Sequence, residues 1–437
     1  MTRFRYSGLI SVFVLLVSQK AMAQTGDTRF VEQGLHALNE VLIHDITSPP
    51  VASRDYVYPL IAFYEAVRPG YSGYKSYAGR LNGLTPLPEI SPALKYDWLT
   101  AGATAFYKTS YGLVFSKELF QQLWDSIAVG IRQRPVPKDV YERSVQFGEQ
   151  VAAHILKWSR EDNLVRIRTL PRFTPGTKPG TWQQTSPDYM EAVEPYWNQM
   201  RPMTLSKPDQ FLLDTPAVYK SDKFLKECHE VFETGNTLTR EQTRIADFWD
   251  CNPFATQTVG HLMYSVKKLS PAGHWVGITG VAVRKRKQNL IEALYAYSLV
   301  SVAIYDAVIA CWDEKFRSNY IRPVTAIQQL LSPVWEPHLQ TPPFPEYPSG
   351  HSVISNASAV ILSSIYGDDF HFVDDVEISY GLPRRSFKSF YQAADEAAIS
   401  RMYGGIHFRE AIEYGKDLGR NVGNYVRQKL KLKVDSK

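Results

Sequence analysis

Tyr347-Pro348-Ser349-Gly350-His351-Ser352-Val353-Ile354 is the stretch that decides the fold, because it joins a turn of small residues to a long apolar segment. Ser349 is a favoured N-cap residue, so the pattern predicts a helix over residues 349–366. Gly350 lets the backbone approach a bound group, and the positive end of the helix dipole favours an anion at that place. His351 follows directly, and a titratable imidazole beside an oxyanion can transfer protons to it.

Positive charge for such an anion comes from two other stretches of the C-terminal half. Lys315 and Arg322 are seven residues apart, so on a continuous helix they would share one face. Arg401 and His407 are separated by Gly404-Gly405, so a bend in the chain, rather than helical periodicity, would direct the imidazole. These residues predict a cationic pocket that holds an oxyanion beside two histidines.

In chain order the three stretches read K-x6-R-P, P-S-G-H and S-R-x5-H, all within residues 315–407. This signature resembles that of the superfamily that joins the vanadium-dependent haloperoxidases to the type 2 phosphatidic-acid phosphatases and the bacterial acid phosphatases. The resemblance covers residues 240–430 and implies a site for vanadate or phosphate. The binding set that it implies consists of three cations and two hydrogen-bond donors: Lys315, Arg322, Arg401, Ser349 and Gly350.

The resemblance also assigns roles to the two histidines. His407 would be the metal ligand, bonding vanadium through Nε2, and His351 would face the opposite side of the vanadate as acid and base. In a haloperoxidase this arrangement accepts a proton from hydrogen peroxide, and halide is then oxidised to hypohalous acid. In a phosphatase that cleaves a phosphate ester, His407 would instead be the nucleophile that forms a phosphohistidine, and His351 would protonate the leaving alcohol.

Residues near the core motif favour the haloperoxidase. Trp312 and Phe344 occupy positions that look similar in haloperoxidases, where an aromatic group beside the vanadate would help to place a halide; plain core packing is the other interpretation. Ala411 stands where phosphatases carry an Asp that orients the nucleophilic His, although Glu410 or Glu413 would be a substitute. We therefore expect a vanadate-dependent haloperoxidase. A secreted phosphomonoesterase of the acid phosphatase type and a non-catalytic oxyanion binder remain as alternatives.

An acid–base histidine normally has a carboxylate partner. Asp250 and Asn252, in a segment that resembles the one providing this partner in haloperoxidases, are the two candidates for His351. Asp250 is preferred, because an Asn would lower the pKa of the imidazole relative to an Asp. A structural ion pair is the competing interpretation of Asp250.

Residues 1–23 have the pattern of a secretory signal peptide: Arg3 and Arg5, then the apolar run Leu9–Val17, then Ala21-Met22-Ala23 as the cleavage site. We therefore expect a periplasmic or secreted protein. Lys and Arg number 49 against 44 Asp and Glu, and cleavage would remove three of the basic residues, which is not the charge balance of a nucleic-acid-binding protein. No later segment reaches the roughly 18 unbroken apolar residues that indicate a membrane span.

Helical periodicity dominates both halves of the chain, so we predict an all-α protein of two packed helical bundles, with the oxyanion site in the C-terminal bundle. The N-terminal domain would occupy residues 24–222, with a long Pro- and Trp-rich loop at about 169–209, and the C-terminal domain residues 223–437. The predicted helices cover residues 30–46, 51–67, 93–109, 116–134, 138–160, 240–249, 256–269, 289–312, 349–366, 386–403 and 407–430.

The chain has three cysteines, Cys228, Cys251 and Cys311, so at most one disulfide can form within it, and the sequence leaves the pairing open. They are not part of a zinc-type cluster of closely spaced Cys and His, and the spacing therefore gives no indication of a metal site built from them.

Overall fold

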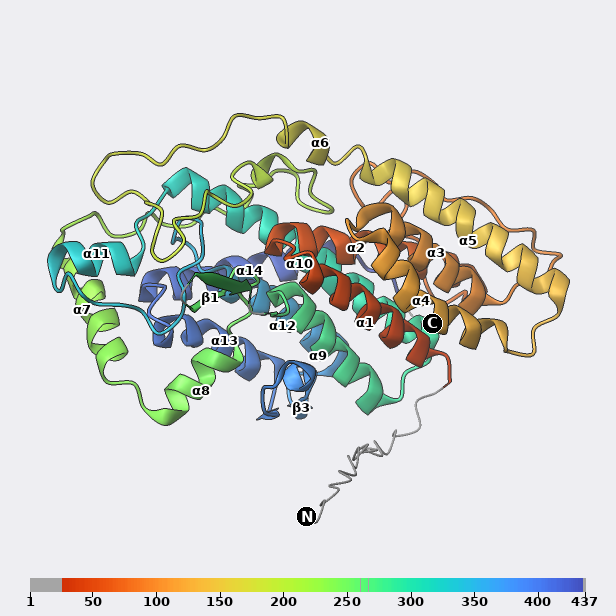
Figure 1. Ribbon diagram of the computed structural model, residues 1–437. Coiled ribbons are helices and arrows are strands. Elements are labelled where there is room, and N and C mark those ends of the chain that lie inside the picture. The colour runs from red at the N-terminus through yellow and green to blue at the C-terminus, as the bar shows by residue number, and fades with distance from the viewer. Residues whose placement is uncertain (1–25, 260, 266, 435–437) are drawn as a thin grey trace, which may run out of the picture.

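The computed structural model describes residues 26–259, 261–265 and 267–434, so the predicted signal peptide lies outside the described residues. Within them, fourteen α-helices and two small two-stranded sheets build an all-α protein, as the sequence predicts (Figure 1). The helices of the first half are α1 (Thr28–His44), α2 (Pro49–Val67), α3 (Trp98–Leu113), α4 (Lys117–Arg132), α5 (Lys138–Ser159) and α6 (Leu164–Ile167). Those of the second half are α7 (Asp222–Asn236), α8 (Arg240–Phe248), α9 (Pro271–Arg286), α10 (Leu290–Ser318), α11 (Pro323–Leu330), α12 (Gly350–Tyr366), α13 (Phe390–Tyr403) and α14 (Arg409–Lys429). Single 3-10 turns are η1 (Arg68–Gly70), η2 (Trp197–Gln199) and η3 (Val376–Tyr380).

Helix α2 is the centre of the N-terminal bundle. Ser48 caps it by accepting a hydrogen bond from the Val51 amide, and Pro49-Pro50 occupies its first turn, where no amide donor is needed. Nearly every side chain of α2 is buried, because α3 and α5 pack on it from its own bundle and α10 packs on it from the other. The two halves of the chain therefore share one hydrophobic core, which runs from Phe30 to Leu432.

Helix α10 joins the two bundles. Asn289 and Glu292 form a capping box at its start, and Asn319, in the left-handed conformation with φ of 45°, ends it. By length and composition this is the one helix, among those described, that could cross a membrane, but 94% of its most apolar window is buried inside the protein. Helices α2, α12 and α14 surround it, so its apolar character is that of a core helix. Its last turns carry Trp312 and Lys315.

Helices α12 and α14 approach each other closely along a line of glycines. Gly415, Gly419 and Gly423 follow one another four residues apart on the face of α14 that meets α12. A Cβ atom at Gly419 would lie 2.3 Å from the carbonyl oxygen of Val353, so only glycine fits there. This contact holds the first turn of α12, which follows Ser349, against α14.

The helix predicted over residues 256–269 is wrong, because this segment forms an antiparallel hairpin of β1 (Thr256–Val259) and β2 (Leu262–Ser265). Strand β1 is rich in β-branched residues, which favour strand over helix. The second sheet pairs β3 (Phe372–Asp374) with β4 (Arg385–Phe387), so α13 begins later than predicted. The sequence pattern also does not predict α7, α9 or α11, which are separate elements here.

The Pro- and Trp-rich segment, residues 169–209, runs as an extended strap across α10 (Figure 1). Thr204 is held by Asp306 of α10, whose carboxylate accepts its amide N–H at 2.8 Å. The Val193 amide donates to the carbonyl of Pro343 at 3.0 Å. The strap therefore contacts the segment around Pro343, which precedes α12 in the chain.

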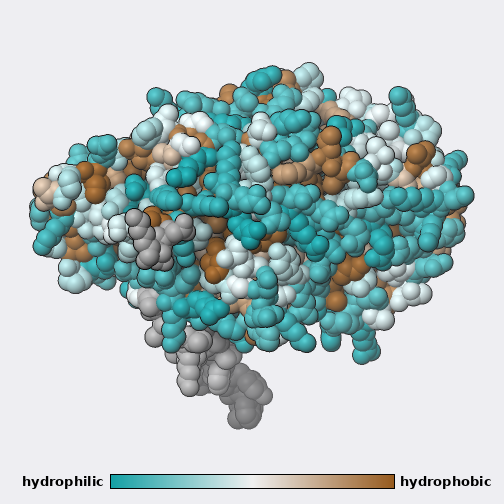
Figure 2. All heavy atoms as spheres, turned by 180° about the vertical axis from the view of Figure 1, so that it is seen from behind, coloured by the Kyte–Doolittle hydropathy of each residue, from teal (hydrophilic) through white to brown (hydrophobic). Residues whose placement is uncertain are grey.

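The surface seen from behind is mainly hydrophilic, with hydrophobic residues scattered over it (Figure 2). The most exposed large apolar side chains in the described chain, Phe115 at 91% and Val334 at 84%, belong to different turns. Single exposed apolar residues of this kind are normal for a folded protein. All three cysteines are buried and have free thiols.

Candidate active site

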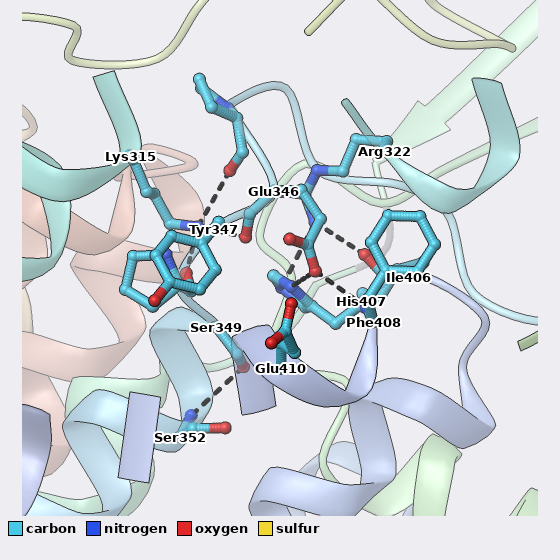
Figure 3. A network of polar contacts seen from close by, with 12 residues as sticks. Lys315, Arg322, Glu346, Tyr347, Ser349, Ser352, Ile406, His407, Phe408 and Glu410 are labelled. Carbon is cyan, nitrogen blue, oxygen red and sulfur yellow. Dashed lines mark hydrogen bonds and ion pairs between the residues drawn. The ribbon is translucent and has the colours of Figure 1, made fainter. Parts of the chain in front are cut away.

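Most of the sequence-predicted residues surround one narrow cavity in the C-terminal bundle, with a volume of about 30 Å³, whose lining does not include Lys315, Arg322, Ser349 or Asp250. Several members of the predicted site line it directly: Trp312, Phe344, Gly350, His351, Arg401 and His407. The last turns of α10 and α13 supply Trp312 and Arg401 to this lining, and the first turn of α12 supplies Gly350 and His351. Figure 3 shows the part of this site around His407.

Lys315 and Arg322 do not share a helical face, and that prediction is wrong. Helix α10 ends at Ser318, and Arg322 is the N-cap residue of the next helix, α11. The two cations nevertheless meet, because each lies 5.1 Å from the centroid of the Phe344 ring. A turn, rather than helical periodicity, brings them together.

His407 is a neutral imidazole whose tautomer follows from its two partners (Figure 3). Its Nδ1 lies 2.8 Å from Glu346 Oε1, and its Nε2 lies 3.2 Å from Nη1 of Arg322, which can only donate. Nδ1 therefore carries the proton, and Nε2 keeps a lone pair. Burial and the nearby cations Arg322 and Lys315 lower the pKa of His407 well below its ordinary value, which preserves that lone pair.

Glu346 is a site residue that the sequence reasoning missed. It is fully buried, and its Oε1 accepts hydrogen bonds from His407 Nδ1 and from the Phe408 amide, both at 2.8 Å. Burial raises the pKa of Glu346, while Arg322 and Lys315 act against that rise. The only signal for this role in the sequence is an isolated acidic residue within a run of prolines and aromatics, just before the P-S-G-H motif.

The two acidic residues proposed as substitutes for the phosphatase Asp lie elsewhere. Glu410 pairs with Lys223 and accepts the Ala217 amide at 3.1 Å, and Glu413 lies 3.1 Å from Lys416. The carboxylate that orients His407 therefore precedes the P-S-G-H motif instead of following the histidine.

Arg322 and Arg401 each keep one buried donor without a partner in the described chain. Arg322 donates through Nε to the Phe344 carbonyl and through Nη1 to the Ile406 carbonyl, both at 2.9 Å, which leaves Nη2 unpaired. Arg401 donates through Nη1 to the Trp249 carbonyl at 2.7 Å, which leaves Nε unpaired. Burial lowers the pKa of both guanidinium groups, so an anion that accepts these donors would stabilise them.

Lys315 uses its donors on the backbone. Its Nζ lies 2.9, 3.0 and 2.6 Å from the carbonyl oxygens of Pro345, Glu346 and Pro348. Burial lowers the pKa of Lys315 to about 7, whereas three carbonyl acceptors match the three hydrogens of the charged form. In this structure Lys315 therefore fixes the turn that carries Glu346 and contributes charge to the site from a distance.

Ser349 is the N-cap residue of α12, as predicted. Its hydroxyl accepts the Ser352 amide, and its own amide donates to the carbonyl of Ala411 at 2.9 Å. Gly350 is the first helical residue and lines the cavity. The positive end of α12 therefore faces the site.

His351 has a backbone acceptor. The Trp249 carbonyl accepts a hydrogen bond from its ring, while its Nε2 has no partner in the described chain, so Nδ1 carries the proton and Nε2 is a free base. Burial, followed by the charge of Arg401, lowers the pKa of His351 well below its ordinary value. The Asp250 carboxylate pairs instead with Lys268 and lies 3.8 Å from Arg401 Nη2, which is the arrangement of a structural ion pair.

The wall beside these groups combines aromatic rings with an amide. The ring centroids of Trp312 and Phe344 are 5.1 Å apart, and the Trp312 indole N–H donates to the carbonyl of Val193 in the strap at 3.2 Å. Asn252 also lines the cavity: its Oδ1 accepts the Phe254 amide at 3.1 Å, and its Nδ2 has no partner in the described chain. Asn252 therefore offers a donor to the site.

A family model described as the VCPO second helical-bundle domain matches residues 295–334 and 331–436. No curated protein matches the chain. The solved structure described as the first bacterial vanadium-dependent iodoperoxidase is 45% identical in sequence, with a TM-score of 0.87 over 94% of this chain and 98% of that one. This chain belongs to the vanadium-dependent haloperoxidase family. Holo and apo structures of a bacterial vanadium-dependent chloroperoxidase are each 15% identical to this chain and share its fold. Their TM-scores are 0.67 and 0.66, over 88% and 87% of this chain and 92% of each of theirs.

The donor set of this site fits vanadate. Arg322 Nη2, Arg401 Nε and Asn252 Nδ2 are buried donors without acceptors in the described chain, which a multiply charged oxyanion would satisfy. His407 Nε2 is a neutral imidazole nitrogen whose ring is oriented by a carboxylate through Nδ1, which is the usual arrangement of a metal-ligating histidine.

Proposed function

We propose that this haloperoxidase uses bound vanadate and hydrogen peroxide to oxidise halide to hypohalous acid, with iodide as its principal halide. The observation that carries the proposal is the state of the two imidazoles. His407 Nε2 is prepared as a ligand, because Glu346 holds the proton on Nδ1, and His351 Nε2 is an unpaired base in the same cavity. The 45% identical relative is described as an iodoperoxidase, which supports iodide as the first halide to test.

When bound, vanadate would supply a Lewis-acidic centre that activates hydrogen peroxide toward halide. The protein's part is to bind, to orient and to move protons. Arg322 and Arg401 would donate to the vanadate oxygens through their unpaired nitrogens, and His407 would hold the metal. His351 Nε2 would accept the proton that hydrogen peroxide loses, and its lowered pKa keeps that nitrogen unprotonated at neutral pH.

The aromatic wall supports a halide that sheds its water easily. Trp312 and Phe344 are buried and place apolar surface beside the unpaired donors of the site. A weakly hydrated anion such as iodide pays less for leaving water than chloride does when it enters such a cavity. We further infer that the enzyme acts in the periplasm or outside the cell after removal of residues 1–23, which N-terminal sequencing of the protein recovered from those fractions would test.

The test of the proposal is halogenation by protein that has been stripped with chelator and reloaded with orthovanadate. Conversion of a reporter phenol with peroxide should depend on vanadate and be fastest with iodide, then bromide, then chloride. The His407→Ala variant should lose both vanadate binding and turnover, whereas retained turnover would contradict the site assignment. Vanadate-inhibited hydrolysis of p-nitrophenyl phosphate by the stripped protein, without any halogenation, would favour the phosphomonoesterase instead. Binding of vanadate with neither activity would favour the non-catalytic binder.

A further inference from the structure

A second cluster of metal-ligating side chains lies beside the oxyanion site. Cys251 follows α8, His274 is in the first turn of α9, and Glu377 is in η3, so the three come from segments far apart in the chain. All three are buried, and their ligand atoms lie within 4.8 Å of one another. The sequence reasoning found no cluster of this kind because the ligands are spread over residues 251–377 and show no motif spacing.

The distances within the cluster match a tetrahedral metal site. The distance from His274 Nδ1 to Cys251 Sγ is 3.5 Å, and that to Glu377 Oε1 is 3.2 Å. A tetrahedral Zn²⁺ with Zn–S of about 2.3 Å and Zn–N and Zn–O of about 2.0–2.1 Å separates sulfur from nitrogen by about 3.5 Å and nitrogen from oxygen by about 3.3 Å. The two distances in the structure are therefore compatible with ligands of one ion, and the third pair, Cys251 Sγ and a Glu377 carboxylate oxygen, lies within 4.8 Å.

The outer shell of the cluster also has the form of a metal site. His274 Nε2 lies 2.8 Å from Asp374 Oδ2, and both side chains are fully buried. A carboxylate at Nε2 leaves Nδ1 free to bind a metal and fixes the orientation of the ring. The ring of Trp249 stacks on the same imidazole with centroids 4.7 Å apart, which fixes its plane.

Charge favours a cation at the same place. The imidazole of His274 is surrounded by two buried carboxylates, those of Asp374 and Glu377, and by the thiol of Cys251. The charge of Lys268 also acts on Glu377. A divalent cation would displace the protons of the thiol and of His274 Nδ1 and would take their place as the positive charge between the two buried carboxylates. Sulfur, imidazole and a single carboxylate together are ligands that suit Zn²⁺ rather than Mg²⁺ or Ca²⁺.

We propose that Cys251, His274 and Glu377 bind a structural Zn²⁺ ion, with Asp374 orienting His274 and with water or the second Glu377 oxygen in the fourth position. The ion would replace the hydrogen bonds among these side chains with metal–ligand bonds that tie three segments of the fold together. One of them, residues 249–252, supplies the Trp249 carbonyl that contacts Arg401 and His351. The metal would thereby stiffen one wall of the oxyanion cavity, which Cys251 also lines.

The experiment starts with the full mature protein, prepared without an affinity tag, equilibrated with Zn²⁺ and freed of excess metal by gel filtration. Elemental analysis should find about one zinc per chain, independent of added vanadate. Replacement by Co²⁺ should give the near-ultraviolet thiolate charge-transfer band and the visible absorption of a tetrahedral Co²⁺–thiolate site. Folded wild-type protein that holds no zinc and shows no such band would overturn the proposal.

Variants separate the cluster from other thiols. Cys251→Ser and Glu377→Gln should lose the stoichiometric metal, and Cys228→Ser, which changes a buried thiol in a different core cluster, should keep it. Asp374→Asn should keep the stoichiometry but bind Zn²⁺ about 10–100-fold more weakly. Retention of both the metal and the charge-transfer band in Cys251→Ser would overturn the site. If Cys251→Ser does not fold, the Co²⁺ spectrum of the wild type and the metal content of Glu377→Gln still decide the question.

Discussion

Asp250→Asn is expected to lower the stability of the free protein and to tighten vanadate binding at the same time. Asp250 Oδ1 lies 3.8 Å from Nη2 of the buried Arg401. Removing the carboxylate leaves that guanidinium with the Trp249 carbonyl as its remaining close acceptor. We expect a loss of about 1–3 kcal/mol in unfolding free energy, below the usual cost of breaking a buried pair, because the Arg401 contact at 3.8 Å is long and Lys268, the closer partner of Asp250, is partly exposed.

The affinity for vanadate should increase while the stability decreases, because the substitution removes a negative charge near the bound anion. The carboxylate lies on the order of 8 Å from the oxyanion position, counting 3.8 Å to Arg401, the width of the guanidinium and one hydrogen bond of about 2.8 Å. At an effective dielectric constant of about 20, two unit charges at that distance interact by about 2 kcal/mol, or about 30-fold in affinity. Lys268, which shares Asp250, reduces this, so we expect vanadate to bind about 3–30-fold more tightly.

The assay is a calorimetric titration of the stripped protein with vanadate, which measures the affinity. Thermal unfolding is measured on the same protein samples. Asp247→Asn is the matched control, since Asp247 precedes Asp250 by three residues but is 47% exposed and pairs with His338. Weaker vanadate binding by Asp250→Asn would refute this reasoning. So would a fall of about 100-fold or more in kcat/KM for peroxide, which is the size expected if Asp250 supported His351 directly as the base.

Three further predictions concern the base, the buried lysine and the helix contact. His351→Gln should bind vanadate almost normally but lower kcat/KM for hydrogen peroxide by about 10²–10⁴-fold in steady-state kinetics; unchanged peroxide kinetics would exclude it as the base. Burial lowers the pKa of Lys315 to about 7, against about 10.4 in the unfolded chain, so the unfolded state binds more protons between these values. The contribution of this group to the stability of the free protein should therefore rise with pH across that window, and bound vanadate should flatten the dependence in thermal unfolding; an equal slope with and without vanadate would count against it. Gly419→Ala should cost more than about 1 kcal/mol in denaturant unfolding, because the new Cβ would lie 2.3 Å from the Val353 carbonyl oxygen, and wild-type stability would show that α12 and α14 can separate.

The parts of the site that could be predicted from the sequence are those that local chemistry determines. Ser349 caps α12 because its neighbours leave amides that need an acceptor, and Gly350 follows it as the first helical residue. Arg401 and His407 are close in the chain, and the bend at Gly404-Gly405 suffices to bring both to the cavity. Side-chain type and short spacing carry this information directly.

The partners that hold these groups could not be predicted, because they come from distant segments or from the backbone. Glu346 is 61 residues from His407, and its role depends on a turn that Lys315 fixes through three carbonyl groups. The ring of His351 donates a hydrogen bond to the backbone carbonyl of Trp249. Every residue has such a carbonyl, so the sequence cannot show which one is the acceptor. Periodicity likewise failed where a segment changes direction, as it does between Lys315 and Arg322.

The position of α10 in the fold constrains how the molecule can be divided. The segment that matches the family model begins at residue 295, inside α10, and this helix packs on α2 of the first bundle as well as on α12 and α14 of the second. A fragment cut at that boundary would expose to water the apolar face that α2 covers, and it would invite aggregation. Chimaeras between members of the family should therefore exchange α2 and α10 together. A substitution in α10 or α2 at this contact changes the packing of the other helix, so the half that carries the candidate site cannot evolve independently of the helices that precede it.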